Sequence, residues 1–331
     1  MNQRLYEGRF LVSVVGAVIR QDEFRVKHSR MDWERVYRLA DSHRVSPILY
    51  LGILGSWEPV PARWKEALFE RYIETLHCND IFDDAVREIF AAMDMNQIPC
   101  TVLSRGREKK FYPIPEMGGS CVLRVFVSEE QYIQVKGYLV DLGYETEYSL
   151  KNIGERMHRV SGLRVELYRK MPFRPAFYRK TAAKLLDGSQ EMEGYQMVKE
   201  LTQENEFLFR MVRAAYHYVT DELTLLEMLD LYYSHRDCRE SISQESMSAQ
   251  LAAFHAADLA ERLLSIAYLW FGGKDEAVYA QEFEPSELRD VMENRILTRG
   301  LIRAPQGQEH SQAEELSAAI AREIDQENRE E

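Results

Sequence analysis

One short stretch of the chain gathers several side chains that can bind anions. It reads SRGREKKFYPIPEMGGSCVLRVFV and runs from residue 104 to residue 127. Its first glycine can form a tight turn whose backbone N–H groups point at a phosphate, and guanidinium groups bind phosphate oxygens through paired hydrogen bonds. The stretch therefore predicts a phosphate-binding loop that leads into a buried strand. The expected ligand-binding residues are Ser104, Arg105, Gly106, Arg107, Lys110 and Arg124.

A second segment supplies a carboxylate. The run HRVSGLRVELY, residues 158–168, predicts a β-hairpin that turns at Ser161-Gly162. We expect His158 to lie on the first arm, opposite Glu166 on the second. His158 is expected to pair with this carboxylate or to bind the ligand. Catalysis by His158 would need a third group, which the sequence does not identify.

The region around this hairpin is basic. Residues 151–184 hold ten lysines and arginines but only two acids. Together with the basic residues between 105 and 124, these charges could line a cleft that binds phosphates without a metal ion. They could equally be solvated surface charges that pair with acidic helices, and the sequence leaves both interpretations open.

The overall composition limits the class of protein. The 331 residues are 45% hydrophobic and carry a formal net charge of −12, which argues against a nucleic-acid partner and against a membrane-surface protein. The longest apolar run, residues 10–19, has about half the length that spans a bilayer, so we expect a buried first helix. The four cysteines are widely separated without a C-x-x-C pair, which favours a reducing cytoplasm over a zinc ribbon or a disulfide framework.

Periodicity predicts an α+β protein that is mostly helical. Helical spacing of apolar residues extends to about residue 98 and resumes at about residue 171, while the region between them has short Val-rich and Leu-rich runs typical of strands. A helix is expected after residue 127, with Ser128 as its N-cap and Gly143 as its stop. The predicted domains are an N-terminal helical region (1–98), an α/β core with a small mixed sheet (99–170), a C-terminal helical domain (171–303) and an acidic tail (304–331).

Three motifs follow one another along the chain. They are Trp33, Glu34, Ala40, His43, Arg44, Val45 and Pro47; then Arg105-Gly106 followed by Tyr112-Pro113; then Leu142, Gly143 and Tyr144. Their order and spacing resemble the core of the polymerase β-like nucleotidyltransferases, and more narrowly a bacterial family of nucleotidyltransferases known mainly from sequence patterns. The resemblance covers most of residues 30–170 and implies a nucleotidyltransferase-like fold for that region.

The chain departs from this family at the metal site. In the family, the strand after the second motif carries two aspartates that hold divalent metal ions, because Mg²⁺ takes oxygen ligands and neutralises the charge of the leaving pyrophosphate. Here Val122 and Arg124 stand at those positions, and a fixed arginine repels a metal ion. Glu166 remains as the third acid of the pattern, and the resemblance makes it the candidate catalytic residue. The resemblance therefore implies a degenerate member that holds no metal.

Three functional hypotheses follow. The leading one is a cytoplasmic, catalytically inactive nucleotidyltransferase-like protein that needs no cofactor and binds a nucleotide, another phosphorylated molecule or a protein partner. The first alternative is an active transferase that uses Glu166, loop acids and Mg²⁺ to move a nucleotidyl group from a nucleoside triphosphate to an acceptor. The second is a protein-interaction module in which the acidic tail recruits a partner and the cleft is vestigial.

The sequence gives weaker indications of function for three other histidines. His43 follows a helical apolar face, and we expect it to be a cap or a core contact rather than a base. His217 and His235 lie on separate predicted helices near several aspartates. They lack the i, i+4 pairing of ligands that is typical of a helical metal site.

Overall fold

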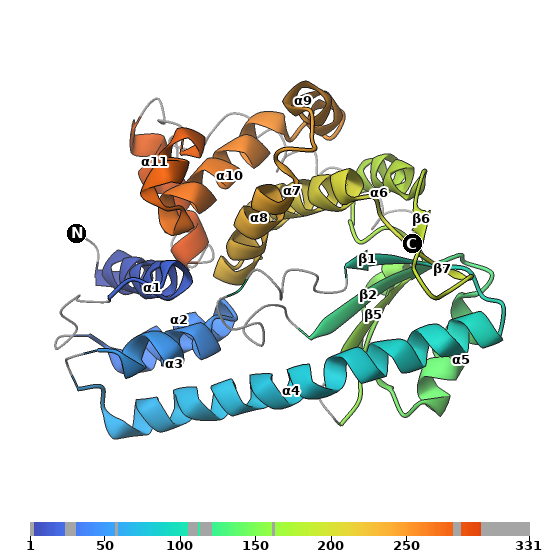
Figure 1. The fold of residues 1–331 in the computed structure, drawn as a ribbon, viewed down its shortest axis with the longest axis horizontal. Coiled ribbons are helices and arrows are strands. Elements are labelled where there is room, and N and C mark those ends of the chain that lie inside the picture. The colour runs from blue at the N-terminus through green and yellow to red at the C-terminus, as the bar shows by residue number, and fades with distance from the viewer. Residues whose placement is uncertain are drawn as a thin grey trace. The chain divides into compact units, whose positions relative to one another are not determined.

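The computed structural model describes residues 3–23, 31–56, 59–104, 112, 121–160, 163–280 and 286–298. These residues form two compact units (Figure 1). The first unit contains the described residues up to Thr75, together with Tyr112 and those from Arg210 onward; the second contains the others, from Leu76 to Phe209. Helices predominate beside one mixed sheet, so the predicted fold class, α+β and mostly helical, is confirmed.

The first unit is helical. Its elements are α1 (Gln3–Arg20), α2 (Trp33–Ser42), α3 (Ser46–Leu54), the first part of α4 (Ala62–Met95), the second part of α7 (Gln203–Val219), α8 (Leu225–Cys238), α9 (Gln244–Ala252), α10 (Ala257–Phe271), η5 (Lys274–Tyr279) and α11 (Ser286–Thr298). The apolar run at residues 10–19 lies within α1 and is mostly buried, as expected. Side-chain caps explain where two helices begin: Asp32 accepts a hydrogen bond from the N–H of Arg35, and Thr224 forms a capping box with Glu227.

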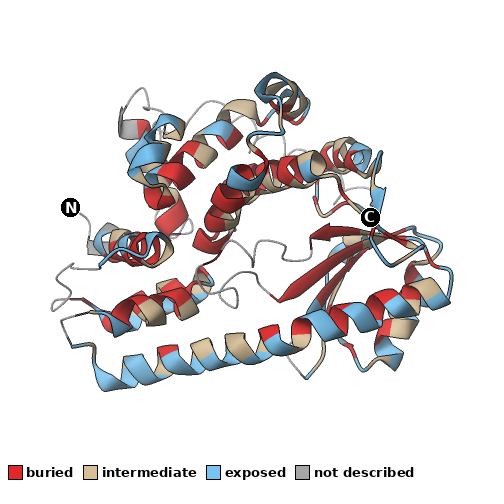
Figure 2. Ribbon diagram, in the orientation of Figure 1, coloured by how far each residue is buried: buried red, intermediate tan, exposed pale blue. Residues whose placement is uncertain are grey.

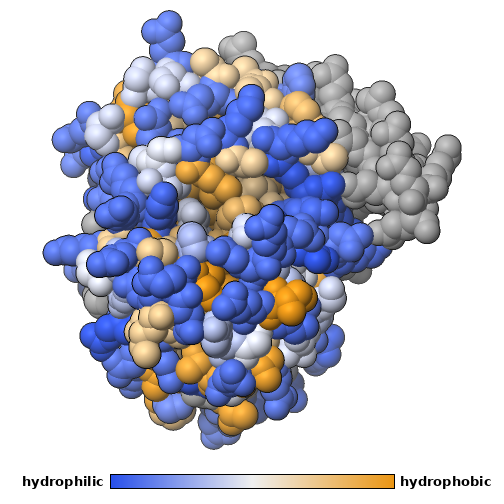
Figure 3. Space-filling model, turned by 90° about the vertical axis from the view of Figure 1, so that its right-hand side faces the viewer, coloured by the Kyte–Doolittle hydropathy of each residue, from blue (hydrophilic) through white to orange (hydrophobic). Residues whose placement is uncertain are grey.

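No helix in the described part of the chain is long and apolar enough to cross a membrane. Large exposed apolar side chains are scattered over several elements, such as Phe69 on α4 and Ile133 on α5. The face drawn in Figure 3 is accordingly mostly hydrophilic, with small separate apolar spots.

The second unit contains a seven-stranded sheet with the order β3-β4-β5-β2-β1-β7-β6. The strands are β1 (Cys100–Ser104), β2 (Val122–Val127), β3 (Glu145–Ser149), β4 (Gly154–His158), β5 (Arg164–Tyr168), β6 (Gln190–Glu191) and β7 (Val198–Glu200). β2 runs parallel to β5, and β1 runs parallel to β7; the other neighbours are antiparallel. The predicted strands at β1 and β2 and the antiparallel pairing of β4 with β5 are confirmed, while the predicted turn at Ser161-Gly162 lies outside the described residues.

The two faces of this sheet differ in polarity. One face is apolar: residues such as Leu123, Val125 and Leu167 pack with the second part of α4 and with α5 (Tyr132–Asp141). Because side chains alternate along a strand, Arg124 and Glu166 lie on the opposite face. Most residues on both faces of β2 and β5 are nevertheless buried (Figure 2), Arg124 and Glu166 among them, so these two charged side chains are shielded from water.

Two predictions about helices in this unit are wrong. Helix α5 begins at Tyr132 rather than just after Ser128, whose hydroxyl instead donates to Gln131 Oε1 at 3.1 Å. The region after residue 171 contains α6 (Ala176–Ala183) and η4 (Lys184–Leu186), but it also contains strands β6 and β7. These short strands form because β7 adds to β1 at the sheet, a tertiary contact that a local pattern does not contain.

A substitution at Gly154 tests how closely β4 approaches β5. A Cβ atom at this position would lie 2.1 Å from the carbonyl oxygen of Leu167 and 3.0 Å from Cα of Tyr168. Both are backbone atoms of the paired strand and cannot move aside alone. We therefore expect Gly154→Ala to lower the free energy of unfolding by about 2–3 kcal/mol, measured by urea denaturation.

Gly137→Ala is the matched control. Gly137 is exposed on α5, and a Cβ atom there would meet nothing within 4 Å. Alanine should raise the free energy of unfolding by about 0.5–1 kcal/mol, because it limits the unfolded chain and favours the helix. Equal effects of the two substitutions would contradict the close approach at Gly154.

Candidate functional site

Five strands place a row of polar side chains on the second face of the sheet. In the parallel pairing of β2 with β5, Arg124 lies beside Glu166; in the antiparallel pairing of β4 with β5, Arg156 lies on the other side of Glu166. On the flanking strands, Ser104 pairs with Arg124 and Tyr148 pairs with Arg156. One acid therefore lies between two arginines.

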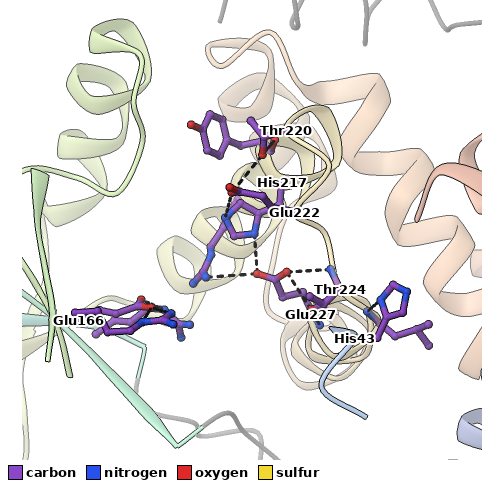
Figure 4. Close-up of polar contacts among 12 residues, drawn as sticks. His43, Glu166, His217, Thr220, Glu222, Thr224 and Glu227 are labelled. Carbon is purple, nitrogen blue, oxygen red and sulfur yellow. Dashed lines mark hydrogen bonds and ion pairs between the residues drawn. The ribbon is translucent and has the colours of Figure 1, made fainter. Parts of the chain in front are cut away.

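The carboxylate of Glu166 contacts three side chains (Figure 4). Arg124 Nε forms an ion pair with Oε2 at 2.8 Å. Arg156 Nε donates to Oε1 at 3.1 Å, and Arg156 Nη2 contacts the same oxygen. The hydroxyl of Tyr168 donates to Oε2 at 2.7 Å. Both oxygens of the carboxylate are held by groups of the chain itself.

This arginine–glutamate row (Arg124, Glu166 and Arg156) is almost shielded from water. The three side chains are 8%, 4% and 15% exposed, respectively. Attraction between charges is stronger in such surroundings than at the surface, and an unpaired charge there is strongly unfavourable. Burial alone would lower the pKa of Arg156, but the Glu166 carboxylate raises that pKa above its ordinary value, so the guanidinium stays charged.

The row does not fit a divalent metal ion. The positions at which the resembling family carries paired aspartates hold a buried valine, Val122, and a cation, Arg124. A metal ion would have to displace guanidinium groups from Glu166 and would then face two positive charges. Elsewhere in the described chain, no three His, Cys, Asp or Glu side chains gather in a way that could hold a metal.

The prediction that His158 lies opposite Glu166 is wrong, because the register of β4 and β5 differs from the expected one. His158 pairs with Arg164, and the residue opposite Glu166 is Arg156. Residues 159–163 connect the two strands, so Arg156 and Glu166 are equidistant from residue 161 along the chain. Neither Arg156 nor the contact from Tyr168 is predicted by the sequence motifs, although the symmetry about residue 161 identifies Arg156 as the residue opposite Glu166.

The other predicted ligand-binding residues fall into two groups. Ser104 is buried at the end of β1, next to Arg124 in the row. Arg105, Gly106, Arg107 and Lys110 lie outside the described residues. The phosphate-binding loop therefore stays a prediction.

Part of the basic stretch at residues 151–184 is engaged in ion pairs. Arg159 Nη1 lies 2.8 Å from Glu88 Oε2, and Arg169 Nη1 lies 3.1 Å from Glu129 Oε1. For these two arginines the structure favours the interpretation of charges that pair with neighbouring acids.

His43 is a structural residue of the first unit. It lies at the end of α2, fully buried, and its Nδ1 accepts a hydrogen bond from the backbone N–H of Leu225 at 3.2 Å. Its Nε2 faces the carbonyl oxygen of Leu297 at 3.4 Å, which requires the neutral tautomer with a proton on Nε2. The prediction that His43 is a cap or core contact is confirmed, since it joins α2 to α8 and α11.

A second charged cluster lies between α7 and α8 (Figure 4). Glu227 Oε1 lies 2.8 Å from Nδ1 of His217 and 3.4 Å from Nη2 of Arg213. Glu227 Oε2 accepts hydrogen bonds from the backbone N–H and the hydroxyl of Thr224, each at 3.1 Å. Burial alone would raise the pKa of Glu227, but attraction to His217 and Arg213 holds it well below its ordinary value. The sequence motifs do not predict this cluster, although the capping-box pattern Thr-Leu-Leu-Glu at residues 224–227 indicates Glu227.

Comparison with known families bears on the site as a whole. Residues 29–272 match the sequence model of a family described as uncharacterised nucleotidyltransferases, and both charged clusters lie inside the matched range. The protein is therefore nucleotidyltransferase-like in class. More particularly, because the match spans well over half of the chain, it belongs to this family of uncharacterised nucleotidyltransferases. Comparisons with curated proteins and with solved structures found no match.

Removal of the central acid tests the energetic role of the row. Glu166→Ala leaves two buried guanidinium groups facing each other, so it should lower the free energy of unfolding by about 3–5 kcal/mol in urea denaturation. The control is Arg164→Ala on the same strand, where the side chain is 48% exposed and its nitrogen lies 3.5 Å from Glu147. That substitution should cost about 0–1 kcal/mol. A loss below about 1 kcal/mol for Glu166→Ala would contradict an energetic role of the row.

The burial of His235 leads us to expect that the protein loses stability in acid. The residue is buried on α8, with Nδ1 2.7 Å from the hydroxyl of Tyr268. Burial, helped by the nearby charge of Arg239, lowers the pKa of His235 to about 4. The unfolded chain therefore binds this proton more readily than the folded one. The contribution to stability is complete above about pH 6.5 and falls by up to about 3 kcal/mol as the pH drops towards 4.

The measurement is the melting temperature of wild type and His235→Gln between pH 7.5 and pH 4.5. The variant should lose less stability over this range than wild type. His77→Gln, at an exposed position on α4, is the control and should follow wild type. Parallel pH curves for wild type and His235→Gln would show that His235 does not govern acid stability.

Proposed function

We propose that this protein is a nucleotidyltransferase-like protein that has lost catalysis and that binds a nucleotide, or another phosphate-bearing ligand, without a metal ion. The observation that carries the proposal is the ion pair between Arg124 and Glu166, at 2.8 Å. The family resemblance implies that metal-binding acids stand at these positions in active relatives. In this chain a guanidinium group takes the place of one acid and neutralises the other.

The loss of catalysis follows from what nucleotidyl transfer requires. The reaction depends on divalent metal ions that bridge the triphosphate and neutralise the leaving pyrophosphate. Glu166 is already held by Arg124, Arg156 and Tyr168. Release of these contacts would leave two cations unpaired in a shielded place, which is strongly unfavourable. Glu129, an acid that could help to rebuild a metal site, is itself paired with Arg169 at 3.1 Å.

The ligand class follows from charge. A guanidinium group attracts phosphate oxygens and fits them with two parallel hydrogen bonds, so an arginine can replace part of the attraction that a metal ion exerts. The sequence supports this assignment with Arg105, Arg107 and Lys110 shortly before β2. A cytoplasmic location, where nucleotides are abundant, is supported by the four free cysteines, Cys78, Cys100, Cys121 and Cys238.

Calorimetric titration of ATP, GTP, CTP and UTP, each with Mg²⁺ and with EDTA, tests the proposal. Wild type should bind at least one nucleotide equally well in both buffers and should release no pyrophosphate. Arg124→Lys keeps the positive charge but loses the planar guanidinium group with its paired N–H donors. It should therefore weaken nucleotide binding tenfold or more, which corresponds to about 1.4 kcal/mol of binding free energy. The control is Arg159→Ala, which removes a charge of the basic stretch at residues 151–184. Because Arg159 is paired with Glu88, this variant should bind like wild type.

Two outcomes would overturn the proposal. Binding that requires Mg²⁺, together with pyrophosphate release that disappears in Glu166→Ala, would establish an active transferase with a non-standard metal site. Absence of binding by any nucleotide, in protein whose melting curve shows it to be folded, would leave the recruitment of a protein partner as the function.

A further inference from the structure

We propose that His217 and Glu227 form a second reactive site, a general-base dyad that activates a water molecule for ester hydrolysis. His217 would be the catalytic residue and Glu227 the positioning residue. Both belong to the first unit, whereas the arginine–glutamate row belongs to the second. The inference does not depend on nucleotide binding.

The orientation of the imidazole follows from the ionised state of Glu227. An ionised carboxylate can only accept hydrogen bonds, so the His217 nitrogen that lies 2.8 Å from Glu227 Oε1 must carry the proton. That nitrogen is Nδ1. Neutral His217 therefore presents the lone pair of Nε2, which is the state that a general base needs.

Glu227 is itself fixed in place. Its second oxygen accepts two hydrogen bonds from Thr224 as part of the capping box of α8. Arg213 adds a positive charge at 3.4 Å from the first oxygen. Attraction to His217, and after it to Arg213, holds the pKa of Glu227 well below its ordinary value. Glu227 is therefore an anion at neutral pH and can stabilise the imidazolium that forms when His217 accepts a proton.

The free nitrogen of the dyad faces a second carboxylate. His217 Nε2 lies 4.0 Å from Glu222 Oε2, too far for a direct hydrogen bond. A water molecule at about 2.8 Å from each atom would span this gap, donating one hydrogen to Nε2 and the other to Glu222. The hydroxyl of Thr220 lies 3.4 Å from the same oxygen of Glu222 and limits its movement.

The dyad reaches the surface of the first unit. The side chains of His217 and Glu222 are 15% and 55% exposed. In the proposed step an O–H bond of the water breaks, the proton moves to Nε2, and the electron pair on oxygen attacks the ester carbonyl. The proton then passes from Nε2 to the departing alkoxide, so water and an ester give an acid and an alcohol, and His217 returns to its neutral form.

Diethyl pyrocarbonate tests the state of Nε2, because it acylates the unprotonated nitrogen of histidine. Peptide mass spectrometry of the full-length protein at pH 7 should show His217 modified at a rate comparable to exposed His77, despite its lower exposure. In Glu227→Gln the amide NH₂ would face Nδ1 and move the proton to Nε2, so modification of His217 should fall tenfold or more while that of His77 is unchanged.

This readout separates the dyad from a role in packing alone. If Glu227 merely holds the turn between α7 and α8 together, Glu227→Gln would loosen the turn and leave modification of His217 unchanged or raise it. Hydrolysis of p-nitrophenyl acetate is the second measurement: His217→Gln should reduce it several-fold, and His77→Gln should not. Unchanged or faster modification of His217 in Glu227→Gln, or equal ester hydrolysis by wild type and His217→Gln, would overturn the proposal.

Discussion

The buried carboxylate of Glu166 is the group on which the polar face of the sheet depends. It lies on β5 and is paired with Arg124 from β2 and with Arg156 from β4. Because side chains alternate between faces, a slip of one residue in either pairing would turn charged side chains towards the apolar core on α4 and α5. A slip of two residues would separate the charges. The row therefore fixes the register of three central strands, which apolar packing alone specifies less strictly.

In the helical unit, too, buried polar groups need partners, and here these groups lie at the start of α8. The backbone N–H groups at the start of α8 would be unsatisfied without caps, and Thr224, Glu227 and His43 supply acceptors for them. Glu227 in turn carries a charge, which His217 and Arg213 balance. One helix start thus determines the position of side chains from α2 and α7. Its rigidity gives His217 a defined orientation, which is the property that a reactive imidazole needs.

The sequence predicts the elements of this protein better than it predicts their contacts. Local patterns suffice for β1, β2 and the pairing of β4 with β5, because apolar runs between turn residues are strong signals. Which residue lies opposite Glu166 depends on which residues form the connection between β4 and β5. A small error in the position of this connection therefore placed His158 opposite Glu166, where the structure has Arg156. The cluster at Glu227 depends on the packing of α7 against α8, for which helical periodicity gives only the faces. Tertiary contacts, not composition, decide which charges meet.

The identity of residue 124 decides whether the sheet depends on a metal ion. With aspartate at this position, two carboxylates would lie side by side in a shielded place with only Arg156 to balance them, and such a pair is stable when a divalent cation lies between its members. Arginine supplies a positive charge beside Glu166 as part of the chain itself. The same contacts give Glu166 a structural role that does not depend on catalysis. Loss of this acid would leave Arg124 and Arg156 as buried like charges, so the fold requires a carboxylate here whatever the site does chemically.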